Sequence, residues 1–320
     1  MAKPRSRTLD YAVYLAVRVA VCVVQAMTWR AALALAECLA WLAHALDKRH
    51  CKVAADNLRT AFPDWPQHKI DRTVRDEYRH FLTVAIEMIK LPRALNPNTL
   101  ARHAVYPDPG HYRDMMRWLG SGRPLIVLTG HVGNWEMFSY ACGLFGVTGA
   151  AVARPLDNPY LDAFVKRFRQ STGQEILAKK GDFDRMDSLL AGGGYLGLLA
   201  DQDAGPRGVF VDFFGKPAST TKGFALMALE HDVPLLVTLS ARVGSPMRYH
   251  LFLADVILPS EYRDRPDAVK AMTQRYASAI EKLVRRYPEQ YFWLHRRWKT
   301  QPKARTQPRP PAEGGERRAG

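Results

Sequence analysis

Short apolar runs alternate with helical segments through the middle of the chain, and this rhythm limits the fold more than any other feature. Four runs are typical of buried strands: PLIVLT (124–129), TGAAVA (148–153), QEIL (174–177) and YLGLLA (195–200). Helical segments separate them near 135–145, 158–172 and 182–191, and Asn158-Pro159 and Asp182 are good helix starts. The pattern predicts an α/β fold in which helices cover a largely parallel sheet.

The flanking segments extend this pattern on both sides. Later segments predict a helix at about 219–231, a buried strand at 234–241, an alternating strand at 248–258 and an amphipathic helix at 266–286. Residues 47–90 are helical in pattern, with Pro66 placed to open a helix and Leu91-Pro92 placed to stop it. We therefore expect a helical segment, then the sheet.

Two apolar runs, 11–27 and 31–46, lie near the N-terminus and are broken by Arg18, Arg30 and Glu37. Each covers roughly 25 Å as a helix, which is short of the ~30 Å hydrocarbon core of a bilayer. Basic residues flank the pair, which by the positive-inside rule keeps both ends cytoplasmic. A shallow hairpin or interfacial anchor fits these runs better than one clean crossing, and a soluble helical pair packed on the core is the alternative.

The chain is therefore divided into three parts. We expect a membrane-associating helical segment at 1–47, an α/β domain at 48–300 and a disordered basic tail at 301–320, which is rich in proline, glycine and arginine. The four cysteines have no metal-like spacing and are interpreted as small apolar side chains of a reduced protein.

The formal net charge is +15 in 320 residues, which indicates an anionic partner such as a nucleic acid, a membrane surface or an acidic substrate. The aromatic residues lie mostly in apolar periodic runs and do not alternate with arginines along a strand, which argues against a nucleic-acid reader.

The stretch GHVGNWE follows the run PLIVLT and carries His131 and Glu136 in a glycine-bearing break. Loops at the carboxyl ends of strands form the functional crevice of α/β sheets. Neutral His131 could take a proton from a hydroxyl, and Glu136 could fix its tautomer. A histidine that only caps a helix or satisfies a loop is the alternative. A second match of this spacing, His103 to Asp108, lies in an irregular segment and is interpreted as structural.

Several motifs in the same order resemble the late acyltransferases of lipid A biosynthesis, the lauroyl/myristoyl transferase family, and their mycobacterial phosphatidylinositol mannoside relatives. Besides GHVGNWE they are ARPLDNP (153–159), ILAKKGD (176–182), LADQDAGPRGVFVDFFGKPASTTKG (199–223), DVPLLVTLSAR (232–242) and WLHRRWK (293–299). The resemblance implies a sheet sandwiched by helices of the glycerol-phosphate acyltransferase type. The FPEGT-type block of the glycerol-phosphate acyltransferases is absent, which makes a simple glycerolipid acceptor less expected.

The resemblance also implies roles for residues and partners. His131 would be the base and Glu136 its partner, while Arg154 would hold a phosphate or the polar end of the donor. Asp203 and Arg207 would organise the active-site loop, and the acceptor site would be shaped by Phe214, Gly215, Ala218 and Thr220. The donor would be acyl carrier protein or acyl-CoA, the acceptor a membrane glycolipid, and the place the cytoplasmic face of the inner membrane. No metal or redox cofactor is required.

Two readings from other classes stay open. Asp201 and Asp203 could be the metal-binding acidic pair of a glycosyltransferase that holds Mg²⁺ or Mn²⁺ on a nucleotide-sugar diphosphate. The chain could also be a non-catalytic lipid-binding membrane protein whose sheet only positions the N-terminal helices, because fold does not settle function.

Overall fold

A computed structural model describes residues 6–147, 149–178, 181–244 and 246–302 of the chain. Apart from residues 301 and 302, the predicted basic tail lies outside these described residues. The helices are α1 (Arg7–Ala26), α2 (Trp29–Leu46), α3 (Lys48–Ala61), α4 (Gln67–Ala94), α5 (Leu100–His103), α6 (Pro109–Leu119), α7 (Trp135–Leu144), α8 (Pro159–Arg169), α9 (Phe183–Ala191), α10 (Gly223–His231) and α11 (Ala268–Arg286), with 3₁₀ turns η1 (Gln170–Thr172), η2 (Gly205–Arg207), η3 (Pro259–Glu261) and η4 (Pro288–Gln290).

The strands form one large sheet and one hairpin. They are β1 (Ala104–Val105), β2 (Leu125–Thr129), β3 (Gly149–Ala153), β4 (Glu175–Ala178), β5 (Tyr195–Leu199), β6 (Val209–Phe213), β7 (Lys216–Thr220), β8 (Leu235–Arg242) and β9 (Tyr249–Ile257). The seven-stranded sheet has the order β1-β9-β8-β2-β5-β3-β4. Adjacent strands in this sheet are parallel, except for β8 and β9, which are antiparallel. The predicted largely parallel, helix-covered sheet is confirmed.

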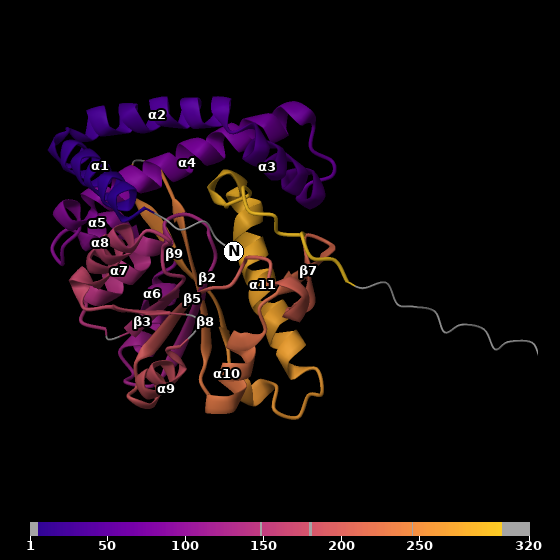
Figure 1. The fold of residues 1–320 in the computed structure, drawn as a ribbon. Coiled ribbons are helices and arrows are strands. Elements are labelled where there is room, and N and C mark those ends of the chain that lie inside the picture. The colour runs from indigo at the N-terminus through magenta and orange to yellow at the C-terminus, as the bar shows by residue number, and fades with distance from the viewer. Residues whose placement is uncertain (1–5, 148, 179–180, 245, 303–320) are drawn as a thin grey trace, which may run out of the picture.

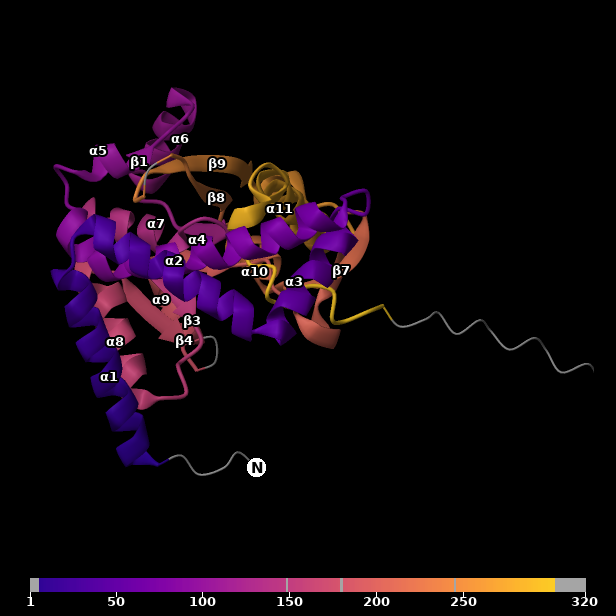
Figure 2. The ribbon, with the colours of Figure 1, turned by 90° about the horizontal axis from the view of Figure 1, so that it is seen from above.

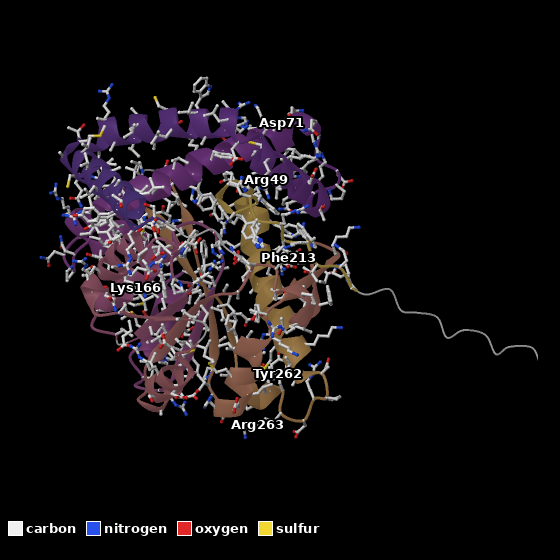
Figure 3. All side chains as sticks on the ribbon, viewed as in Figure 1. Arg49, Asp71, Lys166, Phe213, Tyr262 and Arg263 are labelled. Carbon is white, nitrogen blue, oxygen red and sulfur yellow. The ribbon has the colours of Figure 1, made fainter. Side chains whose placement is uncertain are left out.

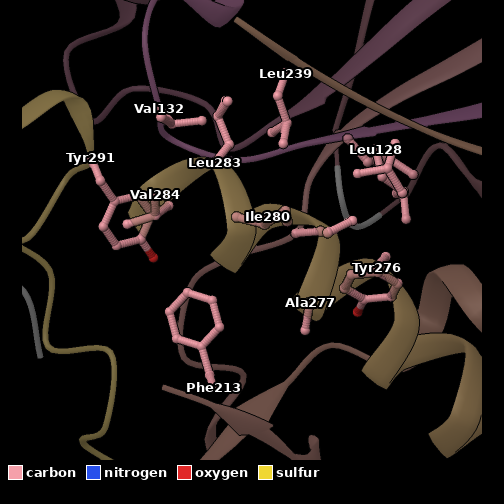
Figure 4. Close-up of a cluster of buried hydrophobic side chains, with 14 of the residues drawn as sticks. Leu128, Val132, Phe213, Leu239, Tyr276, Ala277, Ile280, Leu283, Val284 and Tyr291 are labelled. Atoms are coloured by element: carbon pink, nitrogen blue, oxygen red, sulfur yellow. The ribbon is translucent and has the colours of Figure 1, made fainter. Parts of the chain in front are cut away.

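Helices cover both faces of the sheet because its central strands are apolar on both sides. In β2, Leu125 and Val127 lie in a cluster with Met115 of α6 and Cys142 of α7. The alternate residues of β2, with their neighbours on β5 and β8, face α9, α10 and α11 in the largest cluster, part of which is shown in Figure 4. Each fully buried aliphatic side chain contributes about 1.5–3 kcal/mol, so the two clusters hold β2 firmly as the base of the following loop.

The N-terminal helices form a layer across one end of the sheet, as Figure 1 shows. Helix α2 packs on α4 through a stripe of alanines, Ala32, Ala36 and Ala40, each at most 4% exposed. Helix α1 runs alongside α8 (Figure 2). On their outer sides both helices expose large apolar side chains: Leu9, Tyr11, Val13, Leu15, Val19 and Val23 on α1, and Trp29, Leu39, Trp41, Leu42 and Leu46 on α2. We call these residues the apolar face. The alanine side of α2 thus packs on α4, and the apolar face is left exposed.

Helix α1 is the one helix among the described residues that is long and apolar enough to cross a membrane. It has 20 residues and a mean hydropathy of 1.6, and 11% of its apolar window is buried. The sequence underestimated the length of this helix, because α1 begins at Arg7, ahead of the apolar run, and its 20 residues reach about 30 Å.

One hairpin and two helix boundaries differ from the prediction. The segment VFVDFFGKPAST folds as an antiparallel hairpin, β6–β7, and the following helix begins at Gly223 instead of about 219. Helix α4 continues through Pro92 to Ala94. Proline removes only one hydrogen bond in this last turn, whereas Leu91 and Leu95 are at most 1% exposed, so burial outweighs that loss. The predicted helix starts at Asn158 and Asp182 are confirmed as caps of α8 and α9.

Candidate active site

The loop between β2 and α7 carries His131 at the carboxyl end of a central strand. Gly133 in this loop has a φ of 63°, and a Cβ atom there would lie 2.1 Å from the carbonyl oxygen of Ser240, so the position requires glycine. Asn134 caps α7 by accepting from the N–H of Met137, and its own N–H donates to Oγ of Ser240. The loop is therefore fixed at both ends.

Asp201 holds the imidazole of His131. Nδ1 of His131 lies 2.8 Å from Oδ1 of Asp201, and the backbone N–H of His131 donates to Oδ2 at 2.8 Å. Asp201 follows β5, the parallel neighbour of β2, so two adjacent strand ends bring the residues together. Because a carboxylate only accepts, Nδ1 carries the proton and Nε2 presents a lone pair.

The electrostatics favour an ion-pair-like arrangement of His131 and Asp201. Burial by itself lowers the pKa of His131, but the charge and hydrogen bond of Asp201, with a smaller contribution from Glu136, raise it above its ordinary value. Burial also opposes ionisation of Asp201, yet His131, its backbone N–H and Arg297 lower the pKa of the carboxyl. The pair is therefore suited to stabilise an imidazolium that forms during a reaction.

The reactive edge of His131 is framed by aromatic rings and one amide. The ring centroid of His131 lies 4.9 Å from that of Trp135 and 6.0 Å from that of Phe292. Nε2 of Gln202, an exposed residue, lies 3.5 Å from Nε2 of His131. The His131 side chain is 16% exposed and lies in a mostly aromatic setting.

Glu136 does not contact His131 in the way the sequence predicted. Its carboxylate accepts from Nε of Arg169 at 3.0 and 3.1 Å and pairs closely with Nη2 of the same residue. The first turn of α7 points the Glu136 side chain toward the end of α8, whereas Asp201 occupies Nδ1 of His131. In the structure Asp201, and not Glu136, holds Nδ1 of His131, and the charge of Glu136 acts on His131 only through space.

The segment after α11 clamps the His131 loop from the other side. The N–H of Phe292 donates to the carbonyl of His131 at 3.0 Å, the N–H of Gly133 donates to Gln290 at 3.0 Å, and Val132 bridges Tyr291. The sequence analysis missed this clamp because an isolated bridge has no periodic signature.

A buried polar network supports the loop from beneath. His80 of α4 donates from Nε2 to the carbonyl of Gly133 at 3.1 Å, and its Nδ1 accepts from Arg242 at 3.1 Å. Arg242 also pairs with Glu87 at 2.8 Å and donates to Tyr249 at 2.9 Å. Burial, helped by the charge of Arg242, lowers the pKa of His80 to about 3, which keeps it neutral.

Arg154, Asp203 and Arg207 lie on loops. Arg154 follows β3 with a side chain 86% exposed and lies 3.4 Å from Asp157. Asp203 accepts from the N–H of Gly205 and from the backbone and hydroxyl of Thr300, so it ties the loop after β5 to the C-terminal segment. Arg207 lies exposed on η2.

The predicted acceptor-site residues lie in the β6–β7 hairpin and are largely internal. Phe214, at 5% exposure and φ 58°, and Gly215 form its turn. Ala218 and Thr220 are fully buried, and the Thr220 hydroxyl accepts from Arg297 at 2.6 Å. Figure 3 shows the neighbouring Phe213 beside α11. Direct contact of Phe214, Ala218 or Thr220 with an acceptor would need a rearrangement, so they shape the hairpin's packing instead.

Asp201 and Asp203, the acidic pair of the glycosyltransferase hypothesis, do not point toward one common metal position. Both carboxylate oxygens of Asp201 accept hydrogen bonds from His131. Those of Asp203 accept from the N–H of Gly205 and from Thr300. Within the part of the chain that the structure describes, no group of three or more His, Cys, Asp or Glu residues could hold a metal ion. The structural interpretation of the second histidine match is confirmed, since His103 contacts the carbonyl of Met247 and Asp108 caps α6.

Two cavities meet at the Glu136–Arg169 pair. A narrow one of about 80 Å³ lies between α7 and strands β2, β3 and β5, and is lined by side chains such as Val127, Phe138 and Ile176. A larger one of about 550 Å³ lies between α1, α4, α7 and α8. Both are mostly apolar, so the pair separates two spaces suited to hydrocarbon.

Comparison with known proteins connects this geometry to a family. The family model for bacterial lipid A biosynthesis acyltransferase matches residues 1–300. A lipid A biosynthesis lauroyltransferase of Escherichia coli (strain K12) is 27% identical over 80% of this chain and 81% of its own length. A lipid A biosynthesis palmitoleoyltransferase of the same strain is 24% identical over 80% of both chains.

A more distant match is a phosphatidylinositol mannoside acyltransferase of Mycobacterium tuberculosis (strain ATCC 25618 / H37Rv), 27% identical over 56% of each chain. The names of all three relatives describe acyltransferases. Two of the names refer to lipid A and one to phosphatidylinositol mannoside. The resemblance inferred from the ordered motifs is confirmed: the chain belongs to the bacterial lipid A biosynthesis acyltransferase family and is an acyltransferase.

Proposed function

We propose that the protein transfers a fatty acyl chain from a thioester of acyl carrier protein or coenzyme A to a hydroxyl of a lipid A-like glycolipid. The observation that carries the proposal is the arrangement of His131, whose Nδ1 is bound by buried Asp201 while its side chain stays partly exposed. The relatives named for lipid A acylation supply the acceptor class. The phosphatidylinositol mannoside relatives support a glycolipid in the wider sense.

The proposed chemistry is one acyl exchange. Nε2 of His131 takes the proton of the acceptor hydroxyl while its oxygen attacks the thioester carbonyl. The tetrahedral oxyanion then collapses, the C–S bond breaks, and the leaving thiolate takes the proton back from the imidazolium. Asp201 stabilises that imidazolium and holds the ring, as carboxylates do in triads built on other folds. The chemistry consumes no metal and no redox equivalent.

The other predicted residues take supporting roles in this proposal. Arg154, whose exposed side chain contacts Asp157 at 3.4 Å, would turn from this contact to bind a phosphate of either substrate. Asp203 and Arg207 organise the loop that carries Asp201. Phe214, Gly215 and Thr220 act indirectly, because their hairpin positions Arg297, whose charge lowers the pKa of Asp201.

We also propose that residues 1–47 associate with the cytoplasmic face of the inner membrane, that residues 48–300 form the acyltransferase domain of the glycerol-phosphate acyltransferase type, and that 301–320 is a basic tail. The apolar face of α1 and α2 supports the first part, since large apolar side chains that lie exposed together mark a protein or membrane contact. The +15 charge suits an anionic bilayer and an acidic carrier without requiring nucleic acid.

Intact-lipid mass spectrometry tests the proposal directly. Membranes from cells that express the wild type, His131→Ala or an empty vector are compared in a host that makes lipid A. We expect one lipid class to gain an acyl-sized mass only with the wild type, which also identifies the chain length. Purified wild-type enzyme that forms no acylated lipid from any pair of acyl thioester and lipid A precursor would refute the proposed function.

A further inference from the structure

The larger cavity beside the Glu136–Arg169 pair is a groove walled by α1 and α8, which lie side by side in Figure 2. Its volume is about 550 Å³. Most of its lining is apolar and comes from four helices: Val21, Met88, Ile89, Tyr140, Phe164 and Phe168. A space of this size and chemistry, beside the reactive loop, is suited to a flexible hydrocarbon chain.

The groove is continuous with the apolar face of α1. Val21 and Cys22 line the groove, whereas Val19 and Val23 on the same helix are more than half exposed. A lipid that contacts α1 in a bilayer therefore reaches the groove by sliding along one helix, without passing its chain through water. A donor thioester that arrives on a soluble carrier has no such route, so the groove suits the lipid substrate.

Two arginines give the groove a preference for an anionic lipid. Arg18 of α1 and Arg167 of α8 both line it. Within the described residues neither forms an ion pair with a carboxylate. Arg18 donates to the hydroxyl of Tyr14 at 2.9 Å and lies 5.3 Å from the ring centroid of Phe164. Positive charge next to an apolar groove matches a phosphate at the head of a hydrocarbon chain.

The inner end of the groove reaches the reactive loop. Glu136 and Arg169 line it, and Glu136 directly follows Trp135, whose ring packs on His131. The groove is therefore lined by the residue next to the one that packs on the base.

We propose that the α1–α8 groove binds a hydrocarbon chain of the acceptor lipid, which enters from the bilayer, with the anionic group of that lipid held by Arg18 and Arg167. This inference rests on the proposed acyl transfer and assigns its lipid-binding site. The proposal does not involve the narrow cavity beneath α7, which also contacts the Glu136–Arg169 pair but has no lining residue from α1.

Two native cysteines give a matched test. Cys22 lines the groove, and Cys38 on α2 lies outside it, and both side chains are exposed. Cys22→Trp fills the groove, and we expect it to raise the KM for a lipid A precursor at least about 10-fold, with the KM for the acyl thioester within about 2-fold of wild type. Cys38→Trp should change neither. An unchanged KM for the lipid in Cys22→Trp, or a rise only for the thioester, would overturn the groove assignment while leaving acyl transfer intact.

A binding measurement separates this result from failure of the proposed function. Native mass spectrometry counts dilauroyl phosphatidylglycerol molecules that stay bound to purified wild type, Cys22→Trp and Cys38→Trp. We expect Cys22→Trp alone to lose one bound lipid, whether or not any variant turns over. Equal lipid counts in all three proteins would count against the groove.

Arg167→Ala provides a second variant at an exposed position that does not threaten folding. It should raise the KM for the anionic precursor, whereas Arg113→Ala, an exposed arginine of α6, should not. If both substitutions raise that KM equally, general charge attraction explains the effect and the specific role of Arg167 is refuted.

Discussion

Nδ1 of His131 and Oδ1 of Asp201 lie 2.8 Å apart, although the two residues are 70 positions apart in the chain. The contact exists because β2 and β5 are parallel neighbours, with Thr129 in register with Leu199. The proton on Nδ1 leaves Nε2 as the base, so the carboxylate decides which nitrogen reacts.

Replacing Asp201 should remove most activity without removing the fold. Asp201→Asn keeps the side-chain volume but cannot stabilise an imidazolium, and we expect kcat to fall on the order of 10²–10⁴-fold. Steady-state kinetics of purified protein measure this, with circular dichroism to check folding. Glu136→Gln is the informative comparison. A larger loss of kcat in Glu136→Gln than in Asp201→Asn would mean that the wrong carboxylate has been assigned.

The pH profile should report the same contact. His131 must be neutral to act as a base, and its pKa is raised above about 6.5, so kcat/KM should fall as pH drops through a value above 6.5. In Asp201→Asn, burial lowers the pKa of His131 against only the smaller opposing effect of Glu136, and the acidic limb should move to lower pH. An acidic limb at the same pH in both proteins would contradict the pairing.

The Glu136–Arg169 pair should be energetically coupled. Both side chains are mostly buried, at 15% and 30% exposure, so either single substitution leaves a poorly solvated charge. In a double-mutant cycle with Glu136→Gln and Arg169→Gln, we expect a coupling energy of about 1–2 kcal/mol in denaturant unfolding. The exposed Glu175–Arg185 pair is the control and should give about 0.5 kcal/mol or less. Similar values for the two pairs would refute the expected difference.

Gly133→Ala should be much more costly than a glycine substitution elsewhere. The new Cβ would overlap the carbonyl oxygen of Ser240, and we expect a loss of about 2–4 kcal/mol in the free energy of unfolding. Gly146→Ala is matched, because Gly146 also has positive φ, 72°, but its Cβ would meet nothing within 4 Å. It should cost about 1 kcal/mol or less. Equal losses would show that backbone conformation alone accounts for the effect.

His80 should make the protein sensitive to acid. Its folded pKa is about 3, whereas the unfolded chain binds the same proton near 6.5, so stability is lost as pH falls between these values. His80→Gln removes the one proton that the unfolded chain binds at this position. Between pH 6 and 4, the slope of the free energy of unfolding against pH should therefore be smaller in the variant than in the wild type, by up to about 1.4 kcal/mol per pH unit. Identical slopes in urea unfolding at several pH values would contradict a neutral buried His80.

The apolar face should determine membrane attachment. Leu15→Glu combined with Val19→Glu places two charges on the exposed side of α1, and each charge costs about 2.5–3.5 kcal/mol at the centre of a membrane helix. We expect the variant to shift from the pelleted to the soluble fraction in vesicle sedimentation. Leu226→Glu on α10, where Leu226 is 44% exposed, is the control and should remain with the vesicles. Pelleting of all three proteins would refute the attachment surface.

Sequence patterns predicted the sheet well because its strands are apolar on both faces and its helices have clear starts, as at Asn158. They also singled out His131, because an apolar run followed by a polar, glycine-bearing stretch can be recognised in the sequence alone. They did not find its partner. Asp201 follows YLGLLA as His131 follows PLIVLT, and this likeness was a usable signal, but strand order is needed to place the two side by side. Glu136 was nearer in sequence, yet the helical turn directs it to Arg169.

The clamp formed by residues 290–292 has a consequence for biosynthesis. A chain is made from its N-terminus at about 5–20 residues per second, so α1 is complete on the order of ten seconds or more before Phe292 exists. Until then the carbonyl of His131 and the N–H of Gly133 lack their final partners. The apolar helices thus leave the ribosome while the catalytic loop is still unfinished, and that loop is completed only after residues 290–292 have been made.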